Sequence, residues 1–270
     1  MAILQINHFS KKYKGNEKYA VEDITIDVNE GEIFGFLGPN GAGKSTTIKC
    51  ATGILPFTEG TISICGHSIQ DDSINAKLNM GFVPDNHQMY EQLTAREYIN
   101  FMADLYHIGK EDRKIRADKM LEMFDLSSQI DNQISTFSHG MKQKICVIGA
   151  LVHNPKLWIL DEPLTGLDPK SSYELKELMK EHCKEGNSVF LSSHMLEVVE
   201  KLCDRISIIN KGKIVMTGDL DEIKAKSSDK SLEDIFLSIT GVKNENMNDA
   251  LFSENKEEEK TEEVKEDETK

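Results

Sequence analysis

The sequence predicts an α/β fold built around a mostly parallel sheet, with a block of helices inserted into it. Strand-like and helix-like segments alternate from the buried run Leu157–Leu160 onward, which is typical of parallel sheets. Another buried run, Ile33–Leu37, leads through a glycine-rich turn into a helix expected over about 43–52. The block from about 87 to 153 has a helical apolar period, so we expect it to be all-helical.

The other elements follow from periodicity and turn residues. Ile24, Ile26 and Val28 alternate with polar residues, as in a half-buried strand. Thr94 and Glu97 have the spacing of a capping box, which predicts a helix running to Tyr106. Further strands are expected at Thr61–Cys65, Gly81–Val83, Val189–Ser192, Ile206–Ile209 and Lys213–Met216. Further helices are expected at Arg113–Phe124, from near Ser138, at Tyr173–Cys183, at Met195–Leu202 and from a cap formed by Ser231 with Asp234.

The net charge argues against a nucleic-acid binder. The 270 residues carry a formal net charge of −14, whereas nucleic-acid binders need clustered Lys and Arg. Residues 243–270 hold 11 acidic and 5 basic residues, a net charge of −6, and few large apolar ones. This composition predicts a disordered tail, preceded by a helical extension over 219–242.

Cysteine usage and hydropathy bear on the compartment. The five cysteines are far apart and form no CxxC pair, which is typical of reduced thiols in a cytosolic protein. Met1–Ser10 alternates polar and apolar residues, unlike a signal peptide. No run of roughly 18 apolar residues could span a bilayer, so we expect any membrane role to depend on a partner.

A phosphate-binding loop is the clearest chemical motif. Residues 38–45 match the pattern GxxxxGK[ST] between a strand and a helix. The glycines let backbone N–H groups face the phosphates, and the helix N-terminus adds partial positive charge. We expect Lys44 to bridge the β- and γ-phosphates and Ser45 to bind Mg²⁺. The predicted ATP-binding residues of this loop are Gly38, Pro39, Asn40, Gly41, Ala42, Gly43, Lys44, Ser45 and Thr46.

Two carboxylates end the buried strand Leu157–Leu160. Asp161 lies where nucleotide hydrolases hold Mg²⁺, and Glu162 is placed to polarise an attacking water. A strand followed by solvated acids is common, so this pair is informative only together with the phosphate-binding loop.

A third motif, Phe137-Ser-His-Gly-Met-Lys-Gln-Lys144, lies about 20 residues before that strand. Alone, a Ser-x-Gly at a helix start is most often an N-cap. The run resembles the LSGGQ signature of ABC ATPases, and the chain is identified over residues 1–218 as similar to ABC transporter ATPase subunits. The resemblance implies a phosphate-binding-loop NTPase core with an N-terminal antiparallel β subdomain and an inserted helical subdomain at about 87–153.

The resemblance also implies roles for further residues. Leu164–Pro169 is similar to the D-loop, so Asp168 would contribute across a dimer. His194 resembles the switch histidine that contacts the γ-phosphate. Tyr13 resembles the aromatic residue that stacks on adenine, although Tyr19 is close to it.

The family mechanism supplies the expected assembly. Two subunits, identical or paralogous, enclose two ATP molecules, each between one phosphate-binding loop and the signature of the other subunit. Ser138 and Gly140 would therefore contact the γ-phosphate in trans. A separate transmembrane permease is expected as partner, which would place the chain at the cytoplasmic face of the membrane.

Three positions depart from the family pattern. Asp85 stands where the family often has Gln, and an oxygen of its carboxylate can still contact Mg²⁺ or water. In the signature, His139 replaces the middle Gly and Met141 replaces the Gln. These variants look most like the ATPases of bacterial type-2 ABC exporters, which predicts export.

Other classes are less compatible with the motifs. A soluble ABC ATPase of translation or DNA repair would typically carry two phosphate-binding loops, long coiled coils or zinc modules. A regulatory module that binds ATP without hydrolysing it would not need Glu162 and His194. A small-molecule kinase would need neither the signature nor the D-loop-like run.

Overall fold

The structure is a computed structural model, and it describes residues 1–86, 89–226 and 231–240. The strands are β1 Ala2–Lys12, β2 Tyr19–Asn29, β3 Ile33–Leu37, β4 Glu59–Ile64, β5 His67–Ser68, β6 Met80–Val83, β7 Leu157–Asp161, β8 Ser188–Ser193, β9 Arg205–Asn210 and β10 Lys213–Asp219. The α-helices are α1 Lys44–Ala51, α2 Ser73–Leu78, α3 Ala95–Leu105, α4 Lys110–Met123, α5 His139–Leu151, α6 Pro169–Lys184, α7 Leu196–Leu202, α8 Leu220–Lys226 and α9 Leu232–Thr240.

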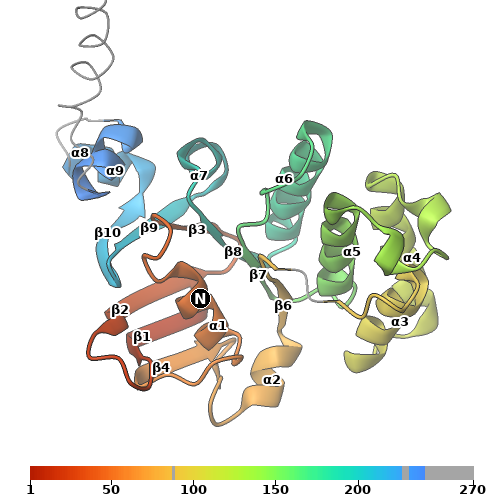
Figure 1. Cartoon of the computed structure of the whole chain (residues 1–270), viewed down its shortest axis with the longest axis horizontal. Coiled ribbons are helices and arrows are strands. Elements are labelled where there is room, and N and C mark those ends of the chain that lie inside the picture. The colour runs from red at the N-terminus through yellow and green to blue at the C-terminus, as the bar shows by residue number, and fades with distance from the viewer. Residues whose placement is uncertain (87–88, 227–230, 241–270) are drawn as a thin grey trace, which may run out of the picture.

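Two sheets organise the chain. A six-stranded sheet has the order β10-β9-β3-β8-β7-β6, and all its pairings are parallel except that of β10 with β9. An antiparallel sheet of order β2-β1-β4-β5 lies beside it (Figure 1). The predicted parallel α/β core with an N-terminal antiparallel β subdomain is confirmed.

The central strands β3, β7 and β8 are buried on both faces, which explains the continuous apolar runs Ile33–Leu37 and Leu157–Leu160. One face packs against the antiparallel sheet and α1, through Phe34, Phe36 and Phe190. The other face packs against the helices, through Trp158 and Leu160. The carboxyl ends of the parallel strands are therefore held rigidly between two apolar layers.

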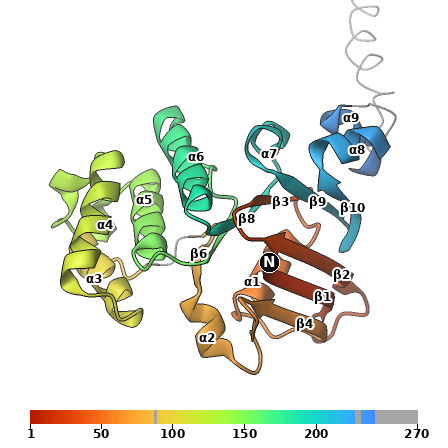
Figure 2. The same cartoon turned by 180° about the vertical axis from the view of Figure 1, so that it is seen from behind.

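Helices α3, α4 and α5 pack together at the β6 end of the sheet, away from the antiparallel sheet (Figures 1 and 2). The predicted capping box is present: Thr94 accepts a hydrogen bond from the Glu97 N–H, and the Glu97 carboxylate accepts one from the Thr94 N–H. Among the described residues, no helix has the length and apolarity needed to cross a membrane.

Element ends differ from the sequence expectation where caps were overlooked. Helix α6 begins at Pro169 rather than near Tyr173, because Asp168 accepts a hydrogen bond from the Ser171 N–H at 3.0 Å. Strand β10 reaches Asp219, one residue past the predicted end of the ATPase unit. The predicted tail, residues 243–270, lies outside the described part of the chain.

Candidate active site

The site forms where three neighbouring parallel strands end. In the six-stranded sheet β8 lies between β3 and β7, with Leu37 opposite Ser193 and Asp161 opposite Ser192. The residues that follow these strands therefore share one edge of the sheet, which is where ligands bind in open α/β folds. The sequence motifs at Gly38, Glu162 and His194 come together at this edge.

The phosphate-binding loop needs its glycines for steric reasons. Gly43 has φ of 114°, and a side chain there would meet Val21 and the Ala20 carbonyl. A Cβ on Gly38 would lie 2.5 Å from the Ile209 carbonyl oxygen. The loop can follow this path only without side chains at these positions, and it leads directly into α1.

Lys44 is buried at the start of α1. Its ammonium donates to the carbonyl oxygens of Gly38 at 2.7 Å and Pro39 at 3.3 Å. It also lies 3.3 Å from Glu162 Oε1. The side chain thus curls back over its own loop, which is where the phosphate groups of a nucleotide would lie.

Asp161 is 2% exposed and is held by two hydroxyl groups. Ser45 Oγ donates to Asp161 Oδ1 at 3.2 Å, and Ser192 Oγ donates to the same oxygen at 2.6 Å. A serine hydroxyl and a carboxylate oxygen in contact form the donor set that binds Mg²⁺ together with substrate phosphates. The predicted metal ligands Ser45 and Asp161 therefore fit the ion, and Asp85 lines the same cavity.

Glu162 follows Asp161 in a conformation that is rare for a glutamate. Its φ is +51°, in the left-handed region, and its N–H donates to Ser192 Oγ at 3.1 Å. His194 Nδ1 lies 2.9 Å from Glu162 Oε2. The other oxygen, Oε1, is buried and accepts no hydrogen bond, although the Lys44 ammonium is near. Glu162 therefore has acceptor capacity left for a water molecule at this position.

A cavity of about 500 Å³ opens above these groups. Its lining includes most of the predicted loop and also residues that the motifs did not indicate, namely Lys18, Tyr19, Ala20 and Lys211. The hydroxyl of Tyr13 lies 3.3 Å from Thr46 Oγ1, which places Tyr13 at the edge of the cavity. Tyr13 and Tyr19 are both close enough to the loop to face a base.

Ser138, Gly140 and Asp168 lie elsewhere. Ser138 is exposed at the start of α5 and caps it by accepting from the Met141 N–H at 3.3 Å. Asp168 caps α6, and hydrogen bonds from Ser171 lower the pKa of its carboxyl group. None of the three lines the cavity of its own chain, and both views place α5 on the far side of the sheet from the antiparallel strands (Figures 1 and 2).

Helix α5 is nevertheless connected to the site through the loop after Glu162. Gln143, which is 1% exposed, donates to the Pro163 carbonyl oxygen. A side chain on Gly166 would lie 3.0 Å from the His139 ring. The signature-like segment and the loop that carries Glu162 thus form one packed unit.

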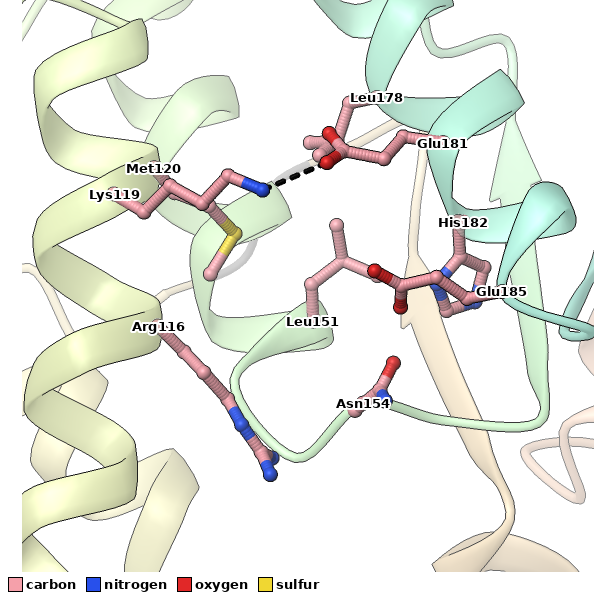
Figure 3. A pocket seen from close by; sticks show the side chains of 9 residues that line it. All are labelled: Arg116, Lys119, Met120, Leu151, Asn154, Leu178, Glu181, His182 and Glu185. Carbon is pink, nitrogen blue, oxygen red and sulfur yellow. Dashed lines mark hydrogen bonds and ion pairs between the residues drawn. The ribbon is translucent and has the colours of Figure 1, made fainter.

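A second cavity, of about 260 Å³, lies between α4, the end of α5 and α6 (Figure 3). The Lys119 ammonium and the Glu181 carboxylate form an ion pair of 2.8 Å across it, as the dashed line shows. It holds none of the residues predicted from the sequence to bind nucleotide.

Comparison with known proteins identifies the family. A family model described as ABC transporter matches residues 21–165, more than half of the chain. The chain belongs to the ABC transporter family. The linearmycin resistance ATP-binding protein LnrL of Bacillus subtilis is 37% identical over 89% of this chain and 76% of its own length. The SkfA peptide export ATP-binding protein SkfE of the same organism is 38% identical over 80% of this chain and 88% of its own length.

Solved structures of ABC proteins have the same fold. One, an ATP-binding subunit of an ABC transporter, has a TM-score of 0.84 at 32% identity and covers 88% of this chain and 99% of its own. Another is a dimeric ATP-binding cassette bound to ADP and Pi, with a TM-score of 0.72 at 26% identity, covering 80% of this chain and 98% of its own. This ABC protein is thus an ATP-binding, ATP-hydrolysing subunit, as the motifs predicted.

Proposed function

We propose that Glu162 orients the water that attacks the γ-phosphate, that His194 holds the Glu162 carboxylate in place, and that Lys44 leaves this carboxylate when a nucleotide binds. The contact of one carboxylate with both of these side chains carries the proposal. Lys44 would turn from Glu162 toward the β- and γ-phosphates and neutralise part of their charge. The freed carboxylate oxygen would then accept a proton from the water.

Mg²⁺ would be held by Ser45 and Asp161, with Asp85 within reach of it or of a bound water. When bound at these residues, the ion would neutralise negative charge that develops on the phosphate groups. Ser45 and Asp161 are already in contact through a hydrogen bond of 3.2 Å. They would therefore bind the ion with little rearrangement.

We propose further that the catalytic site is completed by a second subunit. Ser138 and Gly140 of one chain would face the γ-phosphate held by the other, and Asp168 would lie at the same interface. The exposure of Ser138 at the start of α5 and its absence from the cavity of its own chain support this arrangement. Tyr13 would stack on the adenine.

The transport role extends beyond this chain. We propose that it drives export through a separate transmembrane permease, bound at the cytoplasmic face of the membrane, because SkfE is named for peptide export and LnrL for resistance to linearmycin. The ATPase unit would comprise residues 1–218, with the helical block at about 87–153 as the part that receives the permease. Exposed Asp85, between β6 and α3, would transmit the state of the site to that block.

Replacement of Glu162 tests the proposed chemistry. Glu162→Gln should lower ATP turnover by about 10²–10⁴-fold, the loss typical of a missing general base. ATP binding should persist, because Lys44 and the loop backbone are unchanged. Turnover near the wild-type rate would show that another group activates the water.

A further inference from the structure

The turn between β9 and β10 is built onto the phosphate-binding loop. The Gly212 N–H donates to the Ala42 carbonyl at 2.9 Å, and the Gly212 carbonyl accepts from the Glu22 N–H at 2.8 Å. A side chain on Gly212 would lie 2.8 Å from the Ala20 carbonyl oxygen. Both views show the hairpin meeting the antiparallel sheet beside β2 (Figures 1 and 2).

This attachment fixes the position of Lys211. Lys211 precedes Gly212 in the turn, has φ of +49° and is exposed. Its backbone is therefore held near the loop by the hydrogen bond of Gly212 to Ala42, and the hydrogen bond of Gly212 with Glu22 ties the turn to β2 as well. Lys211 lines the cavity that Lys44, Ser45 and Glu162 also line.

The two lysines of the β9–β10 hairpin, Lys211 and Lys213, differ in their ion pairing. Among the described residues, Lys211 has no carboxylate within ion-pair distance, whereas Lys213, two positions along the same hairpin, pairs with Glu22 at 3.2 Å. Lys44, deeper in the cavity, already faces Glu162. A nucleoside triphosphate brings several negative charges to this cavity, and a lysine in its lining that has no ion-pair partner among the described residues can supply positive charge to them. Lys18 also lines the cavity, but no comparable backbone hydrogen bonds attach it to the loop.

We propose that Lys211 is a nucleotide-binding residue that contacts the anionic part of ATP or ADP from the β9–β10 turn. The inference rests on the proposed function, since it assigns a further contact in the same site. It makes the turn part of the binding site rather than only a support for it.

Binding measurements on matched variants test this. Lys211→Asn removes the charge and keeps a residue that tolerates positive φ. Lys213→Asn removes a charge from the same hairpin and is the control, and Lys211→Arg keeps the charge. Titration calorimetry of the full-length chain with MgATP and with MgADP gives the dissociation constants.

We expect Lys211→Asn to raise both dissociation constants by about three- to tenfold at low salt, as for a partly exposed charge contact. The difference should shrink as salt screens the interaction. Lys211→Arg and Lys213→Asn should bind like the wild type. Equal affinities for Lys211→Asn and Lys213→Asn would overturn the inference while leaving the proposed function intact. If the wild type bound no ATP, the proposed function itself would fail.

Discussion

Ser192 connects Asp161, the proposed metal ligand, with Glu162, the proposed catalytic residue, and its replacement offers a quantitative test. Its hydroxyl donates to Asp161 Oδ1 at 2.6 Å and accepts from the Glu162 N–H at 3.1 Å. The side chain is fully buried at the end of β8. We infer that it positions Asp161 for the metal and holds Glu162 in its left-handed conformation.

Ser192→Ala removes one hydrogen bond to a charged group and leaves the Glu162 N–H without its acceptor. Hydrogen bonds to charged groups contribute about 1.5–3 kcal/mol, and an unsatisfied buried donor costs about 1–3 kcal/mol. These terms overlap, so we expect the free energy of unfolding to fall by about 2–4 kcal/mol. A catalytic group displaced by about 1 Å can lose about 100-fold in rate, so kcat should fall by about 10- to 100-fold.

Ser207→Ala is a matched control for this variant. Ser207 is also fully buried in the six-stranded sheet, and its hydroxyl lies 2.6 Å from Thr217 Oγ1, away from the cavity. Its loss should cost about 1 kcal/mol of stability and leave kcat unchanged. The measurements are urea unfolding and steady-state ATP turnover for both variants. If kcat fell equally in the two, Ser192 would have only a structural role.

Two further predictions concern acid stability and coupling. Burial lowers the pKa of His182 and of His153 to about 4, whereas unfolded histidine titrates near 6.5. The stability gained by keeping these two histidines neutral is thus complete above pH of about 6.5 and is lost as the pH falls toward about 4. Urea unfolding at pH 7 and pH 5 should show a lower free energy of unfolding at pH 5, and His182→Asn should reduce this difference. An equal difference in the variant would show that His182 does not cause it. Asp85→Ala should keep ATP affinity near normal but reduce turnover stimulated by the membrane partner, and complete loss of ATP binding would instead make Asp85 a direct ligand.

The sequence predicted the parallel core because its strands are buried on both faces and carry no polar alternation. It did not predict that β1 runs to Lys12. The pairing of β1 with β2 shifts register between Ile6 and Phe9, where His8 has φ of +47°. The alternation of buried and exposed side chains along β1 is therefore interrupted. Helix α2 was also missed, because it has only 6 residues and buries only Ala76, so it shows no helical apolar period.

The catalytic motifs were recognised because each combines unusual residues with a fixed spacing. The hydrogen bonds by which Ser192 joins Asp161 to Glu162 were not predicted, because they depend on which strand lies beside β7, and only the strand order decides that. The position of Lys211 in the cavity lining was not predicted for the same reason, since the turn reaches the phosphate-binding loop through a tertiary hydrogen bond from Gly212 to Ala42. The sequence resemblance assigned the adenine contact to Tyr13, which lies beside Thr46, whereas the cavity lining includes Tyr19.

The shared catalytic site is the central claim, and two inactive variants test it when mixed. Lys44→Ala breaks both phosphate-binding loops of a homodimer, and Ser138→Arg blocks both signatures. In a mixed dimer, one site combines the intact Lys44 of one chain with the intact Ser138 of the other, while the second site collects both defects. Random exchange makes half of the dimers mixed, so turnover could recover to about a quarter of the wild-type value if the sites act independently.

Coupling between sites could suppress that recovery, so the direct measurement is the number of ATP molecules retained by isolated mixed dimers. Carrying Glu162→Gln in both chains would prevent loss of the nucleotide by hydrolysis. The shared-site account predicts one ATP per mixed dimer and none in closed dimers of either parent variant. Mixed dimers that form but retain no ATP would contradict it.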